Sequence, residues 1–117
     1  MEEYAIIFVL LLFWHALADF PLQGDFIARA KNANTAIPGI SWQYVLGTHA
    51  FIHAVGVVFI TNSWILGAIE FILHTVIDLT KNKNVLNFVE DQACHIACKM
   101  LYIAVLTEAS RTGANLI

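Results

Sequence analysis

The sequence predicts an all-α protein that forms an integral membrane bundle of four helices. Hydrophobic residues make up 59% of its 117 positions and charged residues only 13%, which is more apolar than a typical soluble domain. The apolar residues gather in four segments that polar turns separate. Inside these segments polar residues recur at four-residue spacing, which places them along one face of a helix. Lipid outside and a polar interior would select such a stripe on an otherwise apolar helix.

We expect one domain over residues 1–117, because the length suits a single domain. The four predicted helices cover residues 4–20, 42–61, 64–80 and 88–107. Pro21 and Gly24 end the first of them, and a short surface helix is predicted over residues 25–30. The polar turn at residues 61–63 ends the second helix and offers an N-cap to the third. The tail, residues 108–117, is polar and is expected to fray.

The outer faces of the predicted helices lack charge. Between Trp64 and Ile77 only Glu70 and His74 carry titratable groups, and both belong to the inner stripe. This pattern favours a membrane-embedded bundle. The apolar cores span about 14–18 residues, shorter than the roughly 20 of a comfortable membrane span, so a soluble four-helix bundle stays open as the alternative.

Basic residues predict the orientation in the membrane. Arg29 and Lys31 lie between the first two helices, and Lys81 and Lys83 lie between the last two. Both loops are therefore expected on the cytoplasmic side of the cell inner (plasma) membrane, with both termini outside. The formal charge of −3 indicates no broad basic surface, so nucleic acid is not an expected partner. Membrane lipid is an expected partner, and a homodimer stays open.

Every histidine in the chain has another histidine or an acid four residues away. A single histidine meets this condition by chance about a quarter of the time, and all five together do so about once in a thousand sequences. The groups lie near the cytoplasmic ends of their helices, where antiparallel neighbours would bring them to one layer. They are His15 with Asp19, His49 with His53, Glu70 with His74 and Asp78, and Asp91 with His95.

These side chains are metal ligands by type. Imidazole with carboxylate suits Zn, Fe or Mn, and facing helices of bundle proteins build two-metal sites from such pairs. We expect one or two divalent transition-metal ions, Zn first, with Fe or Mn as alternatives. The predicted ligands are His15, Asp19, His49, His53, His74, Asp78 and His95.

Three further residues on the polar stripe are candidates for chemistry. Glu70 and Asp91 are the predicted catalytic residues, and the alternatives for each are a metal ligand or a partner that orients a histidine. Lys99 continues the face of Asp91 and His95. It is predicted to meet a substrate phosphate, or else to pair with a carboxylate. The competing interpretations of the whole stripe are a proton or ion pathway and a purely structural polar network.

The ordered motifs resemble a known family. They are His15-Ala-Leu-Ala-Asp19-Phe20-Pro21-Leu22-Gln23, His49-x3-His53, Glu70-x3-His74-x2-Ile77-Asp78-x2-Lys81 and Asp91-Gln92-x2-His95. Over about residues 10–100 this set resembles a family of small uncharacterised bacterial and phage membrane proteins, defined as a domain of unknown function. The resemblance implies a membrane helical bundle and no particular activity. More loosely, the pattern is similar to the membrane-bound metal-dependent hydrolases, an analogy that favours hydrolysis.

We therefore expect a metal-dependent hydrolase with its site near the cytoplasmic face. A metal-bound water, with its pKa lowered toward about 7, would attack a phosphoester or amide of a lipid-like substrate. Glu70 or Asp91 would take the proton, and Lys99, Arg29 or Lys31 would draw in an anionic head group. The alternatives are a di-iron oxygen-using enzyme on lipid chains, a metal or proton conduit, and a small phage or bacterial membrane factor that binds a host membrane protein.

Overall fold

The structure, a computed structural model, describes all 117 residues and contains helices but no strands. The all-α prediction is confirmed, and the short helix predicted between the first two long ones is present as α2. The elements are α1 (Glu2–Asp19), α2 (Gly24–Ala30), a 3-10 turn η1 (Ala33–Thr35), α3 (Trp42–Thr61), α4 (Trp64–Asn82) and α5 (Phe88–Thr112).

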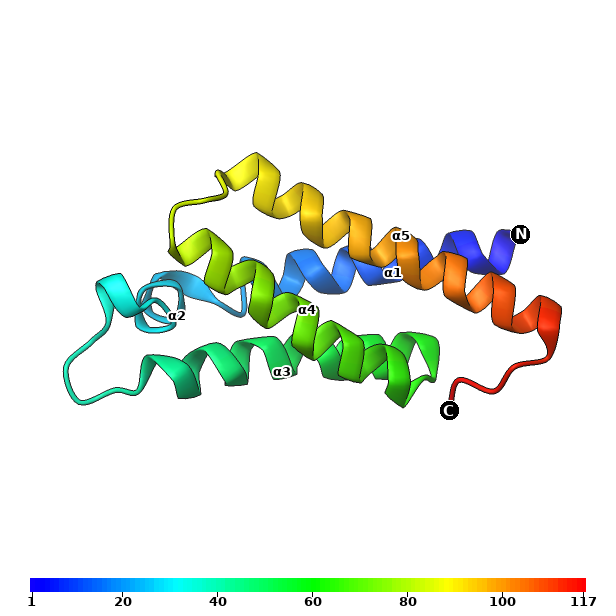
Figure 1. The fold of residues 1–117 in the computed structure, drawn as a ribbon, viewed down its shortest axis with the longest axis horizontal. Helices are drawn as coiled ribbons and strands as arrows, with labels where there is room; N and C mark the ends of the chain where they lie inside the picture. Colours follow the sequence, from blue (N-terminus) through cyan, green and yellow to red (C-terminus); the bar gives the residue numbers. More distant parts are fainter.

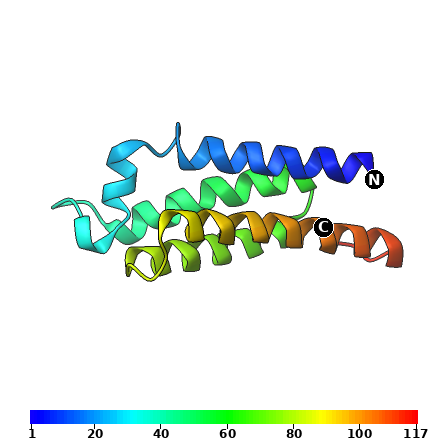
Figure 2. The same cartoon turned by 90° about the horizontal axis from the view of Figure 1, so that it is seen from above.

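The four long helices lie side by side and alternate in direction along a molecule of about 50 × 25 × 23 Å (Figures 1 and 2). α1 packs against α3 and α5, and α4 packs against the same two helices. α2 lies at one end, together with the turn between α4 and α5, and both chain termini lie toward the opposite end (Figure 1). The end that carries α2 therefore collects the C-terminal parts of α1 and α4 and the N-terminal parts of α3 and α5.

Side chains at the helix starts explain where the long helices begin. The hydroxyl of Ser41 accepts a hydrogen bond from the amide of Tyr44 at the start of α3, and Ser63 accepts one from the amide of Leu66 at the start of α4. Such N-caps satisfy amides that have no partner within the helix. The N-cap predicted in the turn at residues 61–63 is thus confirmed.

The C-terminal helix α5 is longer than predicted. It begins with a capping box between Asn87 and Glu90 and continues to Thr112, five residues into the tail that was expected to fray. Two contacts explain the extension. Arg111 donates two hydrogen bonds to the Glu108 carboxylate, and Gly113 takes the left-handed conformation with its amide bonded to the Ala109 carbonyl. This is a common way for a helix to end.

The side chain of Trp14 on α1 holds α3 close to α1. The indole Nε1 of Trp14 donates to the Ile52 carbonyl over 3.1 Å. The same indole covers Gly56, where a Cβ atom would lie 1.9 Å from Nε1. Only glycine therefore leaves room for this contact. It fixes the end of α1 that carries His15, the residue after Trp14.

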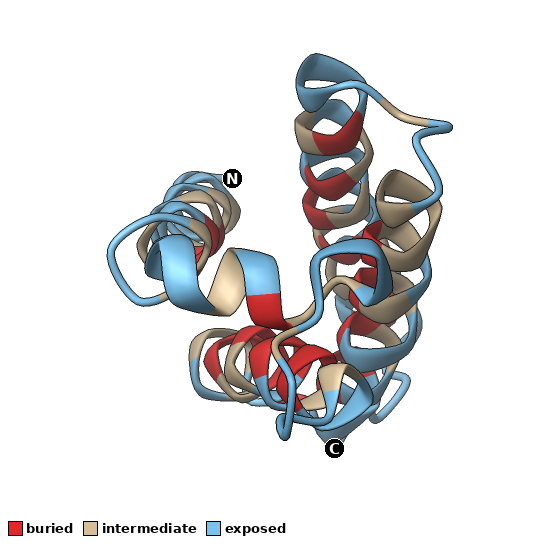
Figure 3. Ribbon diagram, turned by 90° about the vertical axis from the view of Figure 1, so that its left-hand side faces the viewer, coloured by how far each residue is buried: buried red, intermediate tan, exposed pale blue.

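The interior is unusually polar and the surface carries many large hydrophobic side chains. Ten of the 23 buried residues are polar or charged, while 24 large hydrophobic residues, among them Phe13, Phe51, Phe59 and Trp64, are exposed. The buried positions run along the faces that the helices turn toward one another (Figure 3). The apolar core, formed by Leu11, Val57, Leu66 and Tyr102, fills the half of the bundle toward the termini. The buried polar side chains lie mostly between this core and α2.

One helix, α3, is by itself long and apolar enough to cross a membrane. α1 and α2 pass the same test only as a pair, and they are bent by 82° where they meet. Length and composition thus identify one span, or two if the bent pair counts as one, where the sequence analysis expected four. The four-span membrane bundle stays a prediction.

Candidate metal centre

The predicted ligands converge on a single cluster at the α2 end of the bundle. Each long helix contributes, because the four-residue spacing turns each pair to the inward face of its helix. All of them are buried except Asp19, whose side chain is only 10% exposed. The polar cluster consists of His15, Asp19, His49, His53, Glu70, His74, Asp78, Asp91 and His95.

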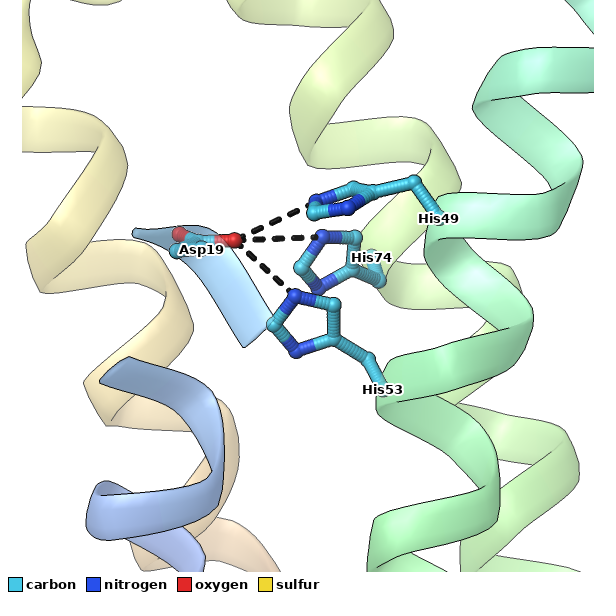
Figure 4. Close-up of side chains that lie close together, drawn as sticks. All are labelled: Asp19, His49, His53 and His74. Carbon is cyan, nitrogen blue, oxygen red and sulfur yellow. Dashed lines mark hydrogen bonds and ion pairs between the residues drawn. The ribbon is translucent and has the colours of Figure 1, made fainter. Parts of the chain in front are cut away.

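The first ligand set surrounds one oxygen of Asp19 (Figure 4). Oδ1 of Asp19 lies 2.9 Å from Nε2 of His53, 3.2 Å from Nε2 of His49 and 4.0 Å from Nε2 of His74. The ligand atoms of these four residues all lie within 4.8 Å of one another. Three imidazoles and a carboxylate at this spacing can hold one metal ion.

A second set lies on the α5 side of the cluster. Nε2 of His95 is 3.6 Å from Oδ1 of Asp78 and 3.6 Å from Oδ1 of Asp91. The three ligand atoms again lie within 4.8 Å of one another, and His15, His74 and His95 form a third group of the same kind. The position of Asp91 therefore agrees with the metal-ligand role that the sequence left open for it.

Asp78 faces both sets, and Asp19 faces the first set and the third group. Oδ2 of Asp78 lies 3.7 Å from Nε2 of His74 in the first set, while Oδ1 faces His95 in the second. Asp19 likewise turns Oδ1 to the first set and Oδ2 to His15, whose Nε2 is 3.2 Å away. Carboxylates that present one oxygen to each of two ligand sets are arranged as in two-metal centres of helical bundles.

Several ligand atoms have no partner within the protein. Nε2 of His49, His74 and His95 and Oδ1 of Asp91 are buried and accept or donate no hydrogen bond. An unsatisfied buried polar atom costs about 1–3 kcal/mol, so four such atoms together are comparable to the whole stability of a small domain, about 5–15 kcal/mol. Bound cations would satisfy all four, because each is a metal ligand atom.

Glu70 lies behind the first ligand set. Its Oε1 is 3.4 Å from Nδ1 of His74, on the opposite side of the ring from Asp19. Lys99 donates to Oε1 and Tyr102 donates to Oε2, both over 2.6 Å. Glu70 thus occupies the position of a carboxylate that orients a metal-binding histidine. Lys99 is fully buried and pairs with Glu70. Of the two roles predicted for Lys99, the structure therefore shows the pairing with a carboxylate and not an approach to a substrate phosphate.

Gln92 connects the two halves of the cluster. Its Nε2 donates to Oδ2 of Asp19 and to Oδ2 of Asp91, both over 3.1 Å, and its Oε1 lies 3.2 Å from Nε2 of His15.

The sequence did not predict the role of Tyr102 as a hydrogen-bond donor to Glu70. Tyr102 nevertheless lies on the face of α5 that carries Asp91, His95 and Lys99. Extending the polar stripe by one more turn would have included it.

Three lysines offset the buried carboxylates. Lys31 pairs with Asp78 over 2.6 Å, Lys81 with Asp91 over 3.2 Å, and Lys99 with Glu70. There are four carboxylates and three ammonium groups, so Asp19 has no ammonium partner and faces only imidazoles and the Gln92 amide. The cluster can therefore accept additional positive charge.

The sequence profile of a family described as "Protein of unknown function (DUF3307)" matches residues 7–116. The chain belongs to this family. The expected resemblance to a domain of unknown function is thereby confirmed, and the match includes every residue of the polar cluster. The resemblance to metal-dependent hydrolases stays a prediction. No curated protein and no solved structure matches the chain significantly.

Proposed function

We propose that this DUF3307 protein is a membrane-embedded, metal-dependent hydrolase with two divalent metal ions, Zn²⁺ first among them, in the polar cluster. The observation that carries the proposal is the pair of carboxylates, Asp19 and Asp78, that each face two ligand sets. One set would hold an ion with His49, His53 and His74. The other would hold an ion with His15, Asp91 and His95.

The membrane part of the proposal rests on the exposed apolar surface. Large hydrophobic side chains are exposed on every long helix, including Val9, Phe59, Val76 and Met100. So many exposed large hydrophobic side chains are unusual for a soluble monomer, whereas lipid tails would cover them. The cluster, α2 and the basic turn between α4 and α5 would then lie near the cytoplasmic face, with the termini on the other side.

Bound divalent ions would polarise the scissile group and lower the pKa of a coordinated water toward about 7. The protein's own residues divide the remaining tasks. Asp91 is the better placed of the two candidate bases, since its Oδ2 lies toward the edge of the cluster between Gln92 and Lys81. Glu70 is occupied by His74, Lys99 and Tyr102 and would act as a positioning residue.

In the reaction we propose, the oxygen of water bonds to the phosphorus or carbonyl carbon of a lipid-like substrate. The proton of the water passes to Asp91, and the bond to the leaving alcohol or amine breaks. The leaving group then takes up a proton, so that Asp91 returns to its ionised form. Water and the substrate are the only reactants that this hydrolysis consumes.

A conduit fits the geometry less well. A proton or ion pathway needs polar side chains from one face of the membrane to the other. Here the polar cluster ends at the apolar core of Leu11, Val57, Leu66 and Tyr102, which fills the other half of the bundle. The polar groups thus end inside the bundle and form no continuous path across it.

The decisive experiment is to measure the metal content of detergent-purified protein by mass spectrometry, together with hydrolysis of lipid phosphoesters and amides. We expect about two Zn²⁺ per chain, loss of metal in His74→Ala, and hydrolysis that a chelator abolishes and Zn²⁺ restores. Thr75→Ala is the matched control, because Thr75 is the next residue of α4 and bonds only to its own helix. Folded protein that binds no metal would overturn the proposal.

A further inference from the structure

A polar cavity of about 290 Å³ lies beside the second ligand set. Its walls come from the α2–η1 segment on one side and from the end of α4 and the following turn on the other. A hydrogen bond from the Asn34 side chain to the Asn82 carbonyl joins the two sides over 2.7 Å. The lining residues are Gln23, Ala28, Lys31, Asn32, Asp78, Lys81, Asn82, Asn84 and Leu86.

This cavity differs in character from the largest one, which lies between α3 and α4 and is lined almost entirely by hydrophobic residues. Seven of the nine residues around the polar cavity are polar, and its two cations, Lys31 and Lys81, outnumber its one acid, Asp78. A water molecule takes up about 30 Å³ in the liquid, so the cavity has room for a group of several heavy atoms. Ammonium and amide donors around such a space suit an oxyanion.

Both lysines of the cavity are paired with carboxylates that can bind metal. Nζ of Lys31 lies 2.6 Å from Oδ2 of Asp78, and Nζ of Lys81 lies 3.2 Å from Oδ2 of Asp91. Each ammonium group therefore neutralises a carboxylate whose charge a bound metal ion would also neutralise. A metal ion and an ammonium group at one carboxylate repel each other, so they compete for it.

We propose that Lys31 and Lys81 exchange with the metal ions and then bind a phosphate group of the substrate in this cavity. In the metal-free protein the lysines neutralise Asp78 and Asp91. When metal ions take over these carboxylates, the flexible lysine side chains turn to the cavity that they already line. The inference rests on the proposed hydrolase and names the chemical class of its substrate.

The exchange makes metal binding and phosphate binding cooperative. Metal ions release the two ammonium groups, and a phosphate that binds them removes the competitors of the metal ions. Such coupling is reciprocal by thermodynamic necessity. Release of Lys81 also removes one of the two donors to Oδ2 of Asp91 and leaves the Gln92 amide as the other.

A second, apolar cavity offers space for an alkyl chain, which a lipid has and a short soluble phosphate ester lacks. It has a volume of about 180 Å³ and is lined by Ile27, Tyr44, Val45 and Ile52 together with His49 of the first ligand set. Ile27 lines the apolar cavity and the next residue, Ala28, lines the polar one, so α2 borders both the proposed phosphate site and the space for an alkyl chain.

The test uses the full-length protein in detergent and two phosphonates, whose P–C bond a hydrolase does not cleave. Methylphosphonate carries the head group alone, and octylphosphonate adds an alkyl chain. Calorimetry would measure their binding to Zn²⁺-loaded protein, freed of excess metal, and to chelator-treated protein. We expect binding at least about tenfold tighter with Zn²⁺ present. Tighter binding of octylphosphonate would assign the phosphate to a lipid, and equal binding would assign it to a soluble ester.

The variants Lys31→Gln and Lys81→Gln have opposite expected effects on the two ligands. Each should weaken phosphonate binding about tenfold, because one charge-assisted hydrogen bond is lost, and should raise the affinity for Zn²⁺, because a competitor is removed. A merely structural lysine would not produce the second effect. Lys83→Gln is the control, since Lys83 is exposed, forms no ion pair and does not line the cavity.

Two results would overturn the inference while leaving the hydrolase intact. One is phosphonate affinity that does not depend on Zn²⁺ in protein that binds Zn²⁺. The other is phosphonate affinity that both lysine variants leave unchanged. Protein that stays folded and binds no Zn²⁺ would overturn the proposed hydrolase itself, and this inference with it.

Discussion

Oε1 of Glu70 lies 3.4 Å from Nδ1 of His74, one turn away on the same face of α4. A carboxylate on this side of the ring favours the tautomer that carries its proton on Nδ1. The lone pair then resides on Nε2, which faces Asp19 and Asp78. This arrangement leaves Nε2 of His74 available to a metal ion.

Removal of this carboxylate should weaken metal binding without removing a ligand. Because Glu70→Gln alone would leave Lys99 buried without a counter-ion, we choose the double variant Glu70→Gln/Lys99→Met. We expect its Zn²⁺ affinity to fall about 10–100-fold, the usual effect of losing such a partner, with stoichiometry unchanged at saturating metal. Competition with a chromogenic chelator measures the affinity. Unchanged affinity would mean that Glu70 does not orient His74.

The same pair predicts a stability cycle. Lys99→Met leaves the Glu70 carboxylate buried without its cation and should lower the free energy of unfolding by about 3–5 kcal/mol. The double variant with Glu70→Gln removes both charges and should recover most of that loss. Thermal unfolding of metal-free protein in detergent measures the stability of both single variants, Glu70→Gln and Lys99→Met, and of the double variant. Additive losses in the double variant would show that the two side chains do not interact.

Metal stoichiometry should reveal the two ligand sets. His53→Ala affects only the first set and His95→Ala chiefly the second, so each is expected to retain about one ion per chain. Asp78→Asn changes a carboxylate that faces both sets and should lower the occupancy of both. Mass spectrometry of the purified variants gives the numbers. Equal loss in all three variants would contradict the division into two sets.

Removal of the metal ions should destabilise the fold. Ions that bind only the folded state at 100 times their dissociation constant contribute about 2.7 kcal/mol, so we expect a chelator to lower the melting temperature by several degrees. Zn²⁺ should restore it, whereas Mg²⁺, which prefers an all-oxygen octahedral shell, should not. Circular dichroism during heating provides the measurement. A melting temperature that chelation leaves unchanged would argue for a purely structural polar network.

The packing of α1 on α3 offers a test that is independent of metal chemistry. Gly56→Ala would place a Cβ atom 1.9 Å from Trp14 Nε1, so we expect a loss of about 1–3 kcal/mol. Gly47→Ala, in the same helix, meets nothing within 4 Å and should gain about 0.5–1 kcal/mol from lower backbone entropy in the unfolded chain. Chemical denaturation of the two variants makes the comparison. Equal stability would show that the two helices are not tightly packed here.

Much of the fold and of the candidate site followed from local patterns. Apolar segments bounded by Ser63, Asn62 and Pro21 predicted the long helices, because caps and breakers act over a few residues. The four-residue spacing of histidines and acids predicted one inward stripe, because the helical repeat alone places such residues on one face. The C-terminal extension of α5 was missed, because the ion pair and the glycine cap that continue it lie in a tail that is polar in composition.

What the sequence determined by itself is the membership of the cluster: all nine predicted histidines and acids lie in it, since helix periodicity decides which side chains share a face. Only the tertiary structure decided their roles. Whether Glu70 faces a metal ion or the back of His74, and whether Lys99 meets a substrate or a carboxylate, depends on the rotation and depth of α4 relative to α5. Those quantities are set by the packing of side chains from distant parts of the chain, and spacing within one helix carries no information about them.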